Sequence, residues 1–187
     1  MNNHERLLKR IRILLWIFIV GLIVSGLTAF ALQTELKILA RWLGAADGAS
    51  ADTYTGFISW IVKVRNGLQD TYSKYPFVGY GTDWLAFAHL ILGVLFIGAM
   101  RDPLRNLWVI TFGMIACVAV FPLAFVCGAI RGIPFYWQLI DCSFGVFGII
   151  PLWLARKYTV QLSCLCDADG PPIPCNPALP RRDAWQN

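Results

Sequence analysis

The stretch LWVITFGMIACVAVFPLAFVCGAI, residues Leu107–Ile130, contains no charged side chain from end to end. About 20 mostly apolar residues are enough to cross the hydrocarbon core of a bilayer as a helix. Hydrocarbon offers no hydrogen-bond partner to an open backbone, so a segment of this kind has to be helical. The stretch therefore predicts a membrane-spanning helix.

Three further segments reach a similar length and apolarity. They are residues 13–32, residues 84–100, which contain His89, and residues 133–155, which contain Asp141. The chain of 187 residues is 57% hydrophobic and 14% charged, whereas a soluble domain is about 45–50% apolar and about 25% charged. We therefore predict an all-α integral membrane protein with a four-transmembrane-helix bundle. This composition excludes ordinary soluble enzymes, disordered chains and disulfide-stapled domains.

Basic residues flank these segments unevenly. The net charge of +5 could indicate nucleic acid, but most of the basic residues lie beside apolar runs, where they orient helices in a bilayer. Ten of the 16 Lys and Arg residues would lie on the side of the termini, although the other side has the longer loop. The positive-inside rule predicts both termini in the cytoplasm, with the bacterial inner membrane as the location and no nucleic acid as a partner.

This orientation divides the chain into a basic cytoplasmic leader at residues 1–12, a periplasmic loop at residues 33–82 and a disordered cytoplasmic tail at residues 156–187. Tryptophans fit the two membrane interfaces. One interface would have Trp84 and Trp137, and the other Trp16, Trp108 and Trp153.

The first apolar segment allows two interpretations. A basic leader followed by Ala29-Phe30-Ala31 resembles a signal peptide with its small-x-small cleavage site. The apolar run exceeds the usual signal-peptide core of about 7–15 residues, which favours an uncleaved anchor. Gly21, Ser25 and Ala29 also share one helix face, and we expect that face to pack closely on another helix.

The periplasmic loop has helical patterns of its own. Gly44 fits a helix C-cap, Asp52 or Thr53 could cap a second helix, and Pro76 would stop that helix. The two apolar faces are Leu36, Leu39, Ala40 and Leu43, followed by Phe57, Ile61, Val64, Leu68 and Tyr72. We expect one or two amphipathic helices that lie on the bilayer, with a receptor surface or lid as the alternative.

The six cysteines form two groups. Cys117, Cys127 and Cys142 lie in predicted spans and are expected to be packing residues. The tail has a C-x-C-x8-C pattern made by Cys164, Cys166 and Cys175. A closed zinc site needs four ligands, often in paired C-x2-C spacing, so we predict no metal site. Zinc binding, lipidation and redox chemistry of these thiols remain alternatives.

No catalytic or nucleotide-binding motif is recognisable. The sequence lacks a Walker loop, a G-x-G-x-x-G motif after a strand, H-E-x-x-H and G-x-S-x-G. His4 and His89 are the two histidines, and the predicted topology puts them at opposite sides of the membrane. This argues against a haem held between two histidines of one chain, and no cofactor is assigned.

Polar residues inside the spans are the remaining functional signal. At a rise of about 1.5 Å per residue, Gln138, His89 and Asp141 lie about 7.5, 9 and 12 Å inward from the periplasmic side. Gln138 and Asp141 share a helix face with Gly145 and Gly148, and His89 shares one with Ala86 and Gly93. We expect such faces to point into the bundle, away from lipid.

These residues predict a periplasm-facing pocket for a quinone or a lipid headgroup. His89, Asp141 and Gln138 would bind the ligand, with Arg131 and Asp83 near the mouth. The alternative is a structural network in which Asp141 pairs with Arg131 or His89.

The function that follows is that of a non-catalytic accessory or binding protein, whose partner is a hydrophobic ligand, another membrane subunit or a second copy of the chain. A membrane enzyme or proton-coupled carrier that uses His89 and Asp141 is the alternative. The absence of a recognisable nucleophile or metal constellation favours the binding protein.

Overall fold

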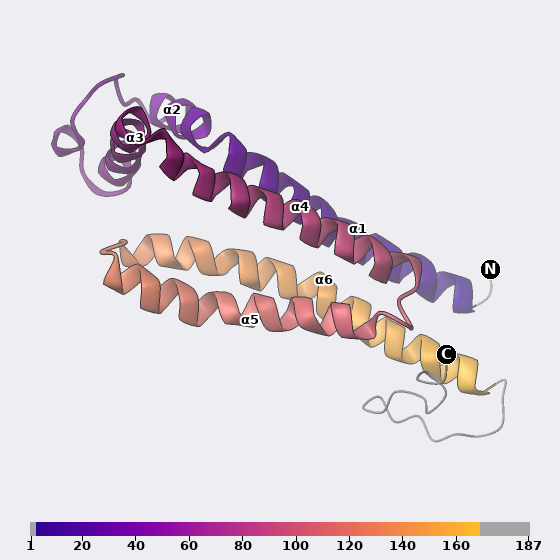
Figure 1. Cartoon of the computed structure of the whole chain (residues 1–187). Helices are drawn as coiled ribbons and strands as arrows, with labels where there is room; N and C mark the ends of the chain where they lie inside the picture. The colour runs from indigo at the N-terminus through magenta and orange to yellow at the C-terminus, as the bar shows by residue number, and fades with distance from the viewer. Residues whose placement is uncertain (1–2, 169–187) are drawn as a thin grey trace. The chain divides into compact units, whose positions relative to one another are not determined.

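The computed structural model describes residues 3–168, with side chains described up to residue 165. This part of the chain has six α-helices, two short 3-10 helices and no strand. Four helices are long and apolar enough to cross a membrane. They are α1 (Asn3–Phe30), α4 (Gly79–Arg101), α5 (Leu107–Ile130) and α6 (Phe135–Ala168) (Figure 1). The predicted all-helical class and the four helices of membrane length are therefore confirmed.

Helix α6 is longer than the sequence predicts. A disordered tail is expected from residue 156, but α6 continues to Ala168. Leu152, Ala155, Thr159 and Leu162 are all buried and follow one another at helical spacing, so the buried face extends beyond the apolar run. The prediction of disorder is therefore wrong for residues 156–168. Residues 169–187, which include Cys175, lie outside the described residues.

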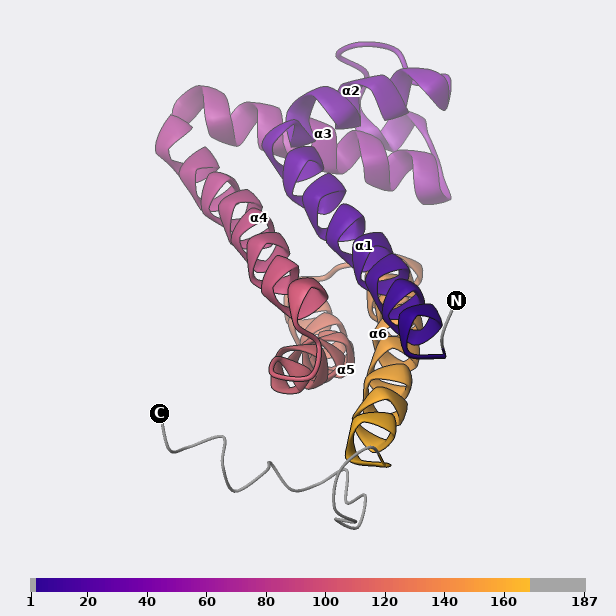
Figure 2. The same cartoon turned by 90° about the vertical axis from the view of Figure 1, so that its right-hand side faces the viewer.

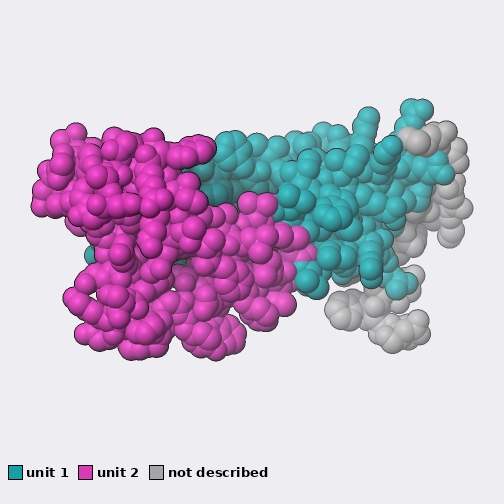
Figure 3. Space-filling view, turned by 90° about the horizontal axis from the view of Figure 1, so that it is seen from above, with its two compact units in different colours: residues 1–20, 94–187 teal, residues 21–93 magenta. Residues whose placement is uncertain are grey.

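The chain divides into two compact units (Figure 3). Unit 1 consists of residues 1–20 and 94–187, and unit 2 consists of residues 21–93. The first part of α1 and the last part of α4 belong to unit 1, together with α5 and α6. Unit 2 contains the remaining parts of α1 and α4, together with α2 (Leu32–Trp42) and α3 (Gly56–Lys74).

Small residues bring the helices of unit 1 together. Helices α5 and α6 form an antiparallel pair joined by a short turn (Figures 1 and 2). A Cβ atom at Gly145 of α6 would lie 2.5 Å from the carbonyl oxygen of Cys117 on α5. Gly113 makes room for Phe96 of α4, whose ring centroid lies 4.7 Å from that of Phe18 on α1. Such close backbone approaches are typical of packed membrane helices.

In unit 2, the C-terminal part of α1 packs against the N-terminal part of α4. The close approach occurs at Gly26, where a Cβ atom would lie 3.0 Å from the carbonyl oxygen of Ala86. The sequence predicts this contact on the face of Gly21, but nothing lies within 4 Å of a Cβ there. That detail is wrong, because residue spacing alone does not reveal where two helices approach. Helices α2 and α3 lie across the ends of these segments (Figures 1 and 2).

Helix α2 follows its predicted pattern. It buries Leu36 and Ala40. Gly44 follows the helix with a φ of 81°, a left-handed conformation that favours glycine after a helix C-terminus. The chain then passes through a short 3-10 helix at Ala51–Thr53, where the Ser50 side chain accepts a hydrogen bond from the backbone of Asp52.

Helix α3 differs from its predicted pattern at its start and on its buried face. Its N-cap residue is Thr55, and no side chain caps it, so the expected cap at Asp52 or Thr53 is wrong. It ends at Lys74, ahead of Pro76, as predicted. Its buried residues are Ile61, Val62 and Arg65, whereas Phe57 of the predicted apolar face is exposed.

The burial of Arg65 explains why the buried face of α3 differs from the predicted apolar face. Its guanidinium donates hydrogen bonds to the carbonyl oxygens of Ala46, at 3.3 Å, and Ala49, at 3.5 Å. The neighbouring Asn66 amide donates to the same carbonyl of Ala49 at 2.9 Å. A buried cation needs such acceptors in place of water. The loop between α2 and α3 therefore folds over α3 and is held by these bonds.

Candidate functional site

Unit 2 contains an open cavity of about 460 Å³ where two chain reversals meet. One reversal is the junction of α1 and α2, and the other joins α3 to α4. The lining consists of residues 29–34 with Tyr72, Pro76, Gly79, Tyr80, Thr82 and Asp83. Ligand pockets in proteins typically have volumes of about 300–1,000 Å³, so this cavity has room for a small ligand group.

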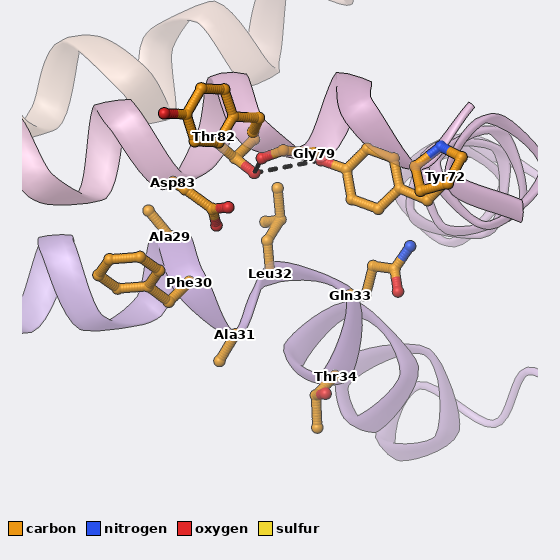
Figure 4. Close-up of a pocket in the computed structure, with 12 residues that line it drawn as sticks. Ala29, Phe30, Ala31, Leu32, Gln33, Thr34, Tyr72, Gly79, Thr82 and Asp83 are labelled. Carbon is orange, nitrogen blue, oxygen red and sulfur yellow. Dashed lines mark hydrogen bonds between the residues drawn. The ribbon is translucent and has the colours of Figure 1, made fainter.

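Local sequence explains both reversals. At the first, Ala31 lies between the end of α1 and the start of α2, with φ −92° and ψ 10° and no side-chain cap. At the second, Pro76 lacks a backbone N–H and disfavours a helical conformation at Tyr75, which has φ −136° and ψ 70°. A 3-10 helix, Pro76–Val78, then leads into α4. The first turns of α4 consequently face the α1–α2 junction (Figure 4).

A chain of hydrogen bonds lines one side of the cavity (Figure 4). The Thr82 hydroxyl donates to the carbonyl oxygen of Gly79 at 2.7 Å, and its Oγ1 lies 3.3 Å from the Tyr72 hydroxyl. A hydroxyl has a single hydrogen, and that of Thr82 is used by Gly79. Tyr72 is therefore the donor in the second bond. Its phenol oxygen keeps its lone pairs for another donor.

Asp83 is the one charged residue among the described residues that line the cavity. Its carboxylate points toward the space between α4 and the α1–α2 junction (Figure 4). The ion pairs of the described part of the chain join Arg41 to Asp47, Lys74 to Asp70 and Arg105 to Asp102, so none involves Asp83. Asp83 is exposed. An unpaired carboxylate at a cavity is available to a ligand.

His89 lies further along α4 in the same unit and does not line this cavity. Its Nδ1 lies 2.7 Å from the carbonyl oxygen of Leu85, one helical turn earlier. Because a carbonyl only accepts hydrogen bonds, Nδ1 carries the proton and Nε2 is the nitrogen left for another partner. The residue is half-buried beside Gly26, where a Cβ atom would lie 3.2 Å from the His89 Cβ. This supports the expectation that His89 is on the packed face of α4.

Gln138 belongs to the turn between α5 and α6 in unit 1. Its Nε2 donates to the carbonyl oxygen of Ile133 at 2.8 Å, and only 6% of the residue is exposed. A Cβ atom at Gly128 would lie 2.7 Å from the Gln138 side chain. The amide therefore satisfies a carbonyl of the turn and fills the space left by a glycine. These contacts are structural.

Arg131 and Asp141 lie in the same unit as Gln138. Arg131 follows α5 as its C-cap residue and is exposed. Asp141 is half-buried on α6. The two form no ion pair in the part of the chain that the structure describes, so the Asp141–Arg131 pair of the alternative interpretation is not found there. Asp83 and His89 thus belong to unit 2, and Gln138, Asp141 and Arg131 to unit 1. Ligand binding by these residues stays a prediction.

Cysteines and acidic residues do not form a metal-binding group in residues that the structure describes. Cys117 and Cys142 are buried, in keeping with their expected packing role, whereas Cys127 is exposed. Cys164 lies on α6 and is half-buried. The side chain of Cys166 and all of Cys175 lie outside the described residues.

The sequence does not predict five polar residues of the cavity, which are Gln33, Thr34, Tyr72, Tyr80 and Thr82. The sequence interpretation puts Tyr72 on an apolar helix face, although its hydroxyl marks it as a residue with a polar end. The available signal is Pro76 followed by Gly79, which indicates a reversal that could turn α3 back toward α4. No pattern indicates that the α1–α2 junction would meet it.

No protein-family model matches this chain, and no curated protein and no solved structure is significantly similar to it.

Proposed function

We propose that this chain is a non-catalytic integral membrane protein that binds the polar headgroup of an amphipathic, lipid-like ligand in the unit 2 cavity. The observation that carries the proposal is Asp83, an exposed and unpaired carboxylate that lines a cavity in the described part of the chain. Ligand sites contain a few polar groups that fix the orientation of the ligand, and Asp83 can act as one of them.

The membrane orientation is part of the proposal. Most basic residues lie at the ends that the sequence assigns to the cytoplasm, which favours cytoplasmic termini in a bacterial inner membrane. Trp16, Trp108 and Trp153 are exposed, as expected for side chains at a membrane interface. The apolar part of α1 ends at Phe30, next to the cavity, so the cavity would lie at headgroup level on the periplasmic side.

The exposed face of α2 supports an interfacial position for the loop helices. Ile38 and Trp42 lie one turn apart on α2, and 85% of Trp42 is exposed. Lys37 and Arg41 flank them and are also exposed. A helix with exposed apolar side chains beside cationic ones is typical of a helix that lies in the bilayer surface.

The experiment measures co-purified lipid in a cavity-filling variant. Ala29 lines the cavity, and Ala29→Trp should fill part of it. Ala88 is exposed on α4 in the same unit and does not line the cavity, so Ala88→Trp is the matched control. Native mass spectrometry from gentle detergent should show lipid-like ligand on the wild type and on the control, and a clear loss in Ala29→Trp.

Equal ligand occupancy in all three proteins would reject the cavity as the binding site. A partner protein retained at fixed stoichiometry in place of lipid would also contradict this proposal, and would favour an accessory subunit. A membrane enzyme or proton carrier built on His89 and Asp141 stays a sequence prediction, since these residues belong to different units.

A further inference from the structure

Two side chains that line the unit 2 cavity, Tyr72 and Asp83, offer only hydrogen-bond acceptors to a ligand. The Asp83 carboxylate accepts hydrogen bonds and donates none. The Tyr72 phenol donates its hydrogen to Thr82, which in turn donates to Gly79, so the Tyr72 oxygen can only accept from a ligand. The Gln33 amide and the Thr34 and Tyr80 hydroxyls offer both donors and acceptors. The cavity therefore complements a ligand group that is rich in donors.

Charge points to the same class of ligand. Asp83 is negative, and no Lys, Arg or His occurs among the described lining residues. An ammonium group has three donors and a positive charge, so it matches both the acceptors and the carboxylate. A quinone presents only carbonyl oxygens, which cannot hydrogen-bond to the Asp83 carboxylate because both groups are acceptors.

Aromatic rings add a third preference. Phe30, Tyr72 and Tyr80 are among the residues that line the cavity. The face of an aromatic ring attracts a cation within about 6 Å of its centroid, and this attraction underlies the recognition of organic ammonium groups. A phosphate or a neutral headgroup gains nothing from this contact.

Exposed apolar side chains lie on the parts of α1 and α4 that belong to this unit. On α1 they include Val24 and Leu27, and on α4 they include Leu85 and Ile91. Such surfaces suit acyl chains, so the cation that fits the cavity is one attached to a lipid. A free amine would make no use of them.

We infer that the cavity recognises the ammonium headgroup of an aminolipid, held by the Asp83 carboxylate and the Tyr72 phenol oxygen. This inference rests on the proposed function and deepens it, because it selects between the two ligand classes that the sequence leaves open. Tyr72 comes from α3 and Asp83 from α4, so the α3–α4 reversal creates the site.

The test compares two lipids with identical acyl chains on the full-length protein in detergent micelles. The probes are phosphatidylethanolamine, which carries an ammonium group, and phosphatidylglycerol, which does not. Native mass spectrometry should show binding of phosphatidylethanolamine that is stronger by about tenfold or more, as expected for one charge-assisted hydrogen bond. Asp83→Asn should abolish this preference, and Tyr72→Phe should weaken it.

Asp70→Asn is the matched control, because Asp70 is an exposed aspartate of the same unit that pairs with Lys74 and does not line the cavity. It should keep the wild-type preference. Persistence of the preference in Asp83→Asn would overturn the inference. The inference would also be overturned if a soluble quinone analogue displaced phosphatidylethanolamine equally well from wild type and from Asp83→Asn. Competition by free ethanolamine at the lipid's concentration would reject a lipid as the source of the amine.

Ala29→Trp separates this inference from the proposed function. If that variant loses both lipids while wild type does not distinguish between them, the cavity binds lipid and only the amine assignment fails. If Ala29→Trp retains both lipids fully, the proposed function fails, and the amine assignment fails with it.

Discussion

Two arginines of unit 2 are held in different ways. Arg41 is exposed, and its Nη2 lies 2.6 Å from Oδ2 of Asp47. This hydrogen bond raises the pKa of Arg41 and lowers the pKa of Asp47. A lowered carboxyl pKa means that the pair adds stability above the ordinary pKa of Asp, about 3.9, and loses it as the pH falls through the lowered value. Arg65 instead donates to backbone carbonyls, which do not titrate.

Replacement of these arginines should separate a buried interaction from an exposed one. We expect Arg65→Met to lower the free energy of unfolding by about 1.5–3 kcal/mol, because it removes hydrogen bonds from a charged and buried donor. Arg41→Met should leave stability nearly unchanged, because exposed ion pairs contribute little. Thermal unfolding of the full chain in detergent, followed by circular dichroism, measures both effects.

Acid provides the control for this pair of variants. As the pH falls through the lowered pKa of Asp47, the carboxylate becomes protonated, so any difference between wild type and Arg41→Met should shrink. The effect of Arg65→Met should persist, and hydrogen exchange of residues 44–55 should be faster in that variant at neutral and at acid pH. If the loss of unfolding free energy in Arg65→Met vanished in acid, a carboxylate, and not the two carbonyls, would be the partner of this guanidinium.

Helical periodicity predicts little about the roles of single polar residues. Asp83 lines a cavity, but His89, Gln138 and Asp141, which the sequence assigns to the same pocket, do not line it. The burial of Arg65 is not predictable either, because its carbonyl partners come from a loop whose fold the sequence does not reveal. Tyr72 and Thr82 were missed for a similar reason. Their cavity forms between chain reversals far apart in the sequence, and helical periodicity carries no information about that encounter.

At the scale of single helices, the sequence is a better guide. The bounds of α5 agree with the predicted span, because Arg105 and Asn106 precede its apolar run and Arg131 follows it. The end of α6 was missed, because its buried face continues through Thr159 among charged residues. Long apolar runs therefore predict where helices occur, whereas their ends depend on packing that extends into polar sequence.

Glycine substitutions test the packing of α5 on α6. At Gly145, a Cβ atom would lie 2.5 Å from a backbone oxygen of α5, and a backbone cannot move aside as a flexible side chain can. Gly145→Ala should therefore lower the melting temperature by several degrees, an overpacking cost of about 1–3 kcal/mol. Gly98→Ala is the matched control on α4, since nothing lies within 4 Å of a Cβ at that position.

The control should be at least as stable as wild type, because alanine favours helix over glycine. Thermal unfolding of both variants in the same detergent provides the comparison. Equal melting temperatures of Gly145→Ala and Gly98→Ala would mean that α5 and α6 do not approach as closely as described.

At the scale of the whole molecule, charge and hydropathy act together. The four long helices have the length and apolarity that membrane insertion requires, and the uneven distribution of Lys and Arg predicts the direction of that insertion. The direction also decides which compartment the Asp83 cavity faces, and therefore which lipid leaflet would supply the ligand. The topology is thus a premise of the proposed function, and it can be tested independently of ligand binding.

Thiol labelling tests this topology. Ser50 is exposed in the loop between α2 and α3, whereas Cys164 lies near the end of α6, on the side assigned to the cytoplasm. Cys127 is an exposed native thiol near the expected periplasmic end of α5, so the experiment uses a Cys127→Ala background. A charged, impermeant maleimide applied to sealed spheroplasts should label the Ser50→Cys variant and leave the background protein unlabelled.

Inverted vesicles provide the reciprocal arm, because they expose the cytoplasmic face. The background protein should then become labelled through its native tail thiols, and Ser50→Cys should gain no further label. The opposite pattern, with native thiols labelled in sealed spheroplasts, would reverse the orientation. The cavity would then face the cytoplasm, and the tail cysteines would lie in an oxidising compartment where disulfides form. The excess of basic residues at the two ends predicts that the chain inserts in a single direction. Labelling from both sides at once would contradict that prediction.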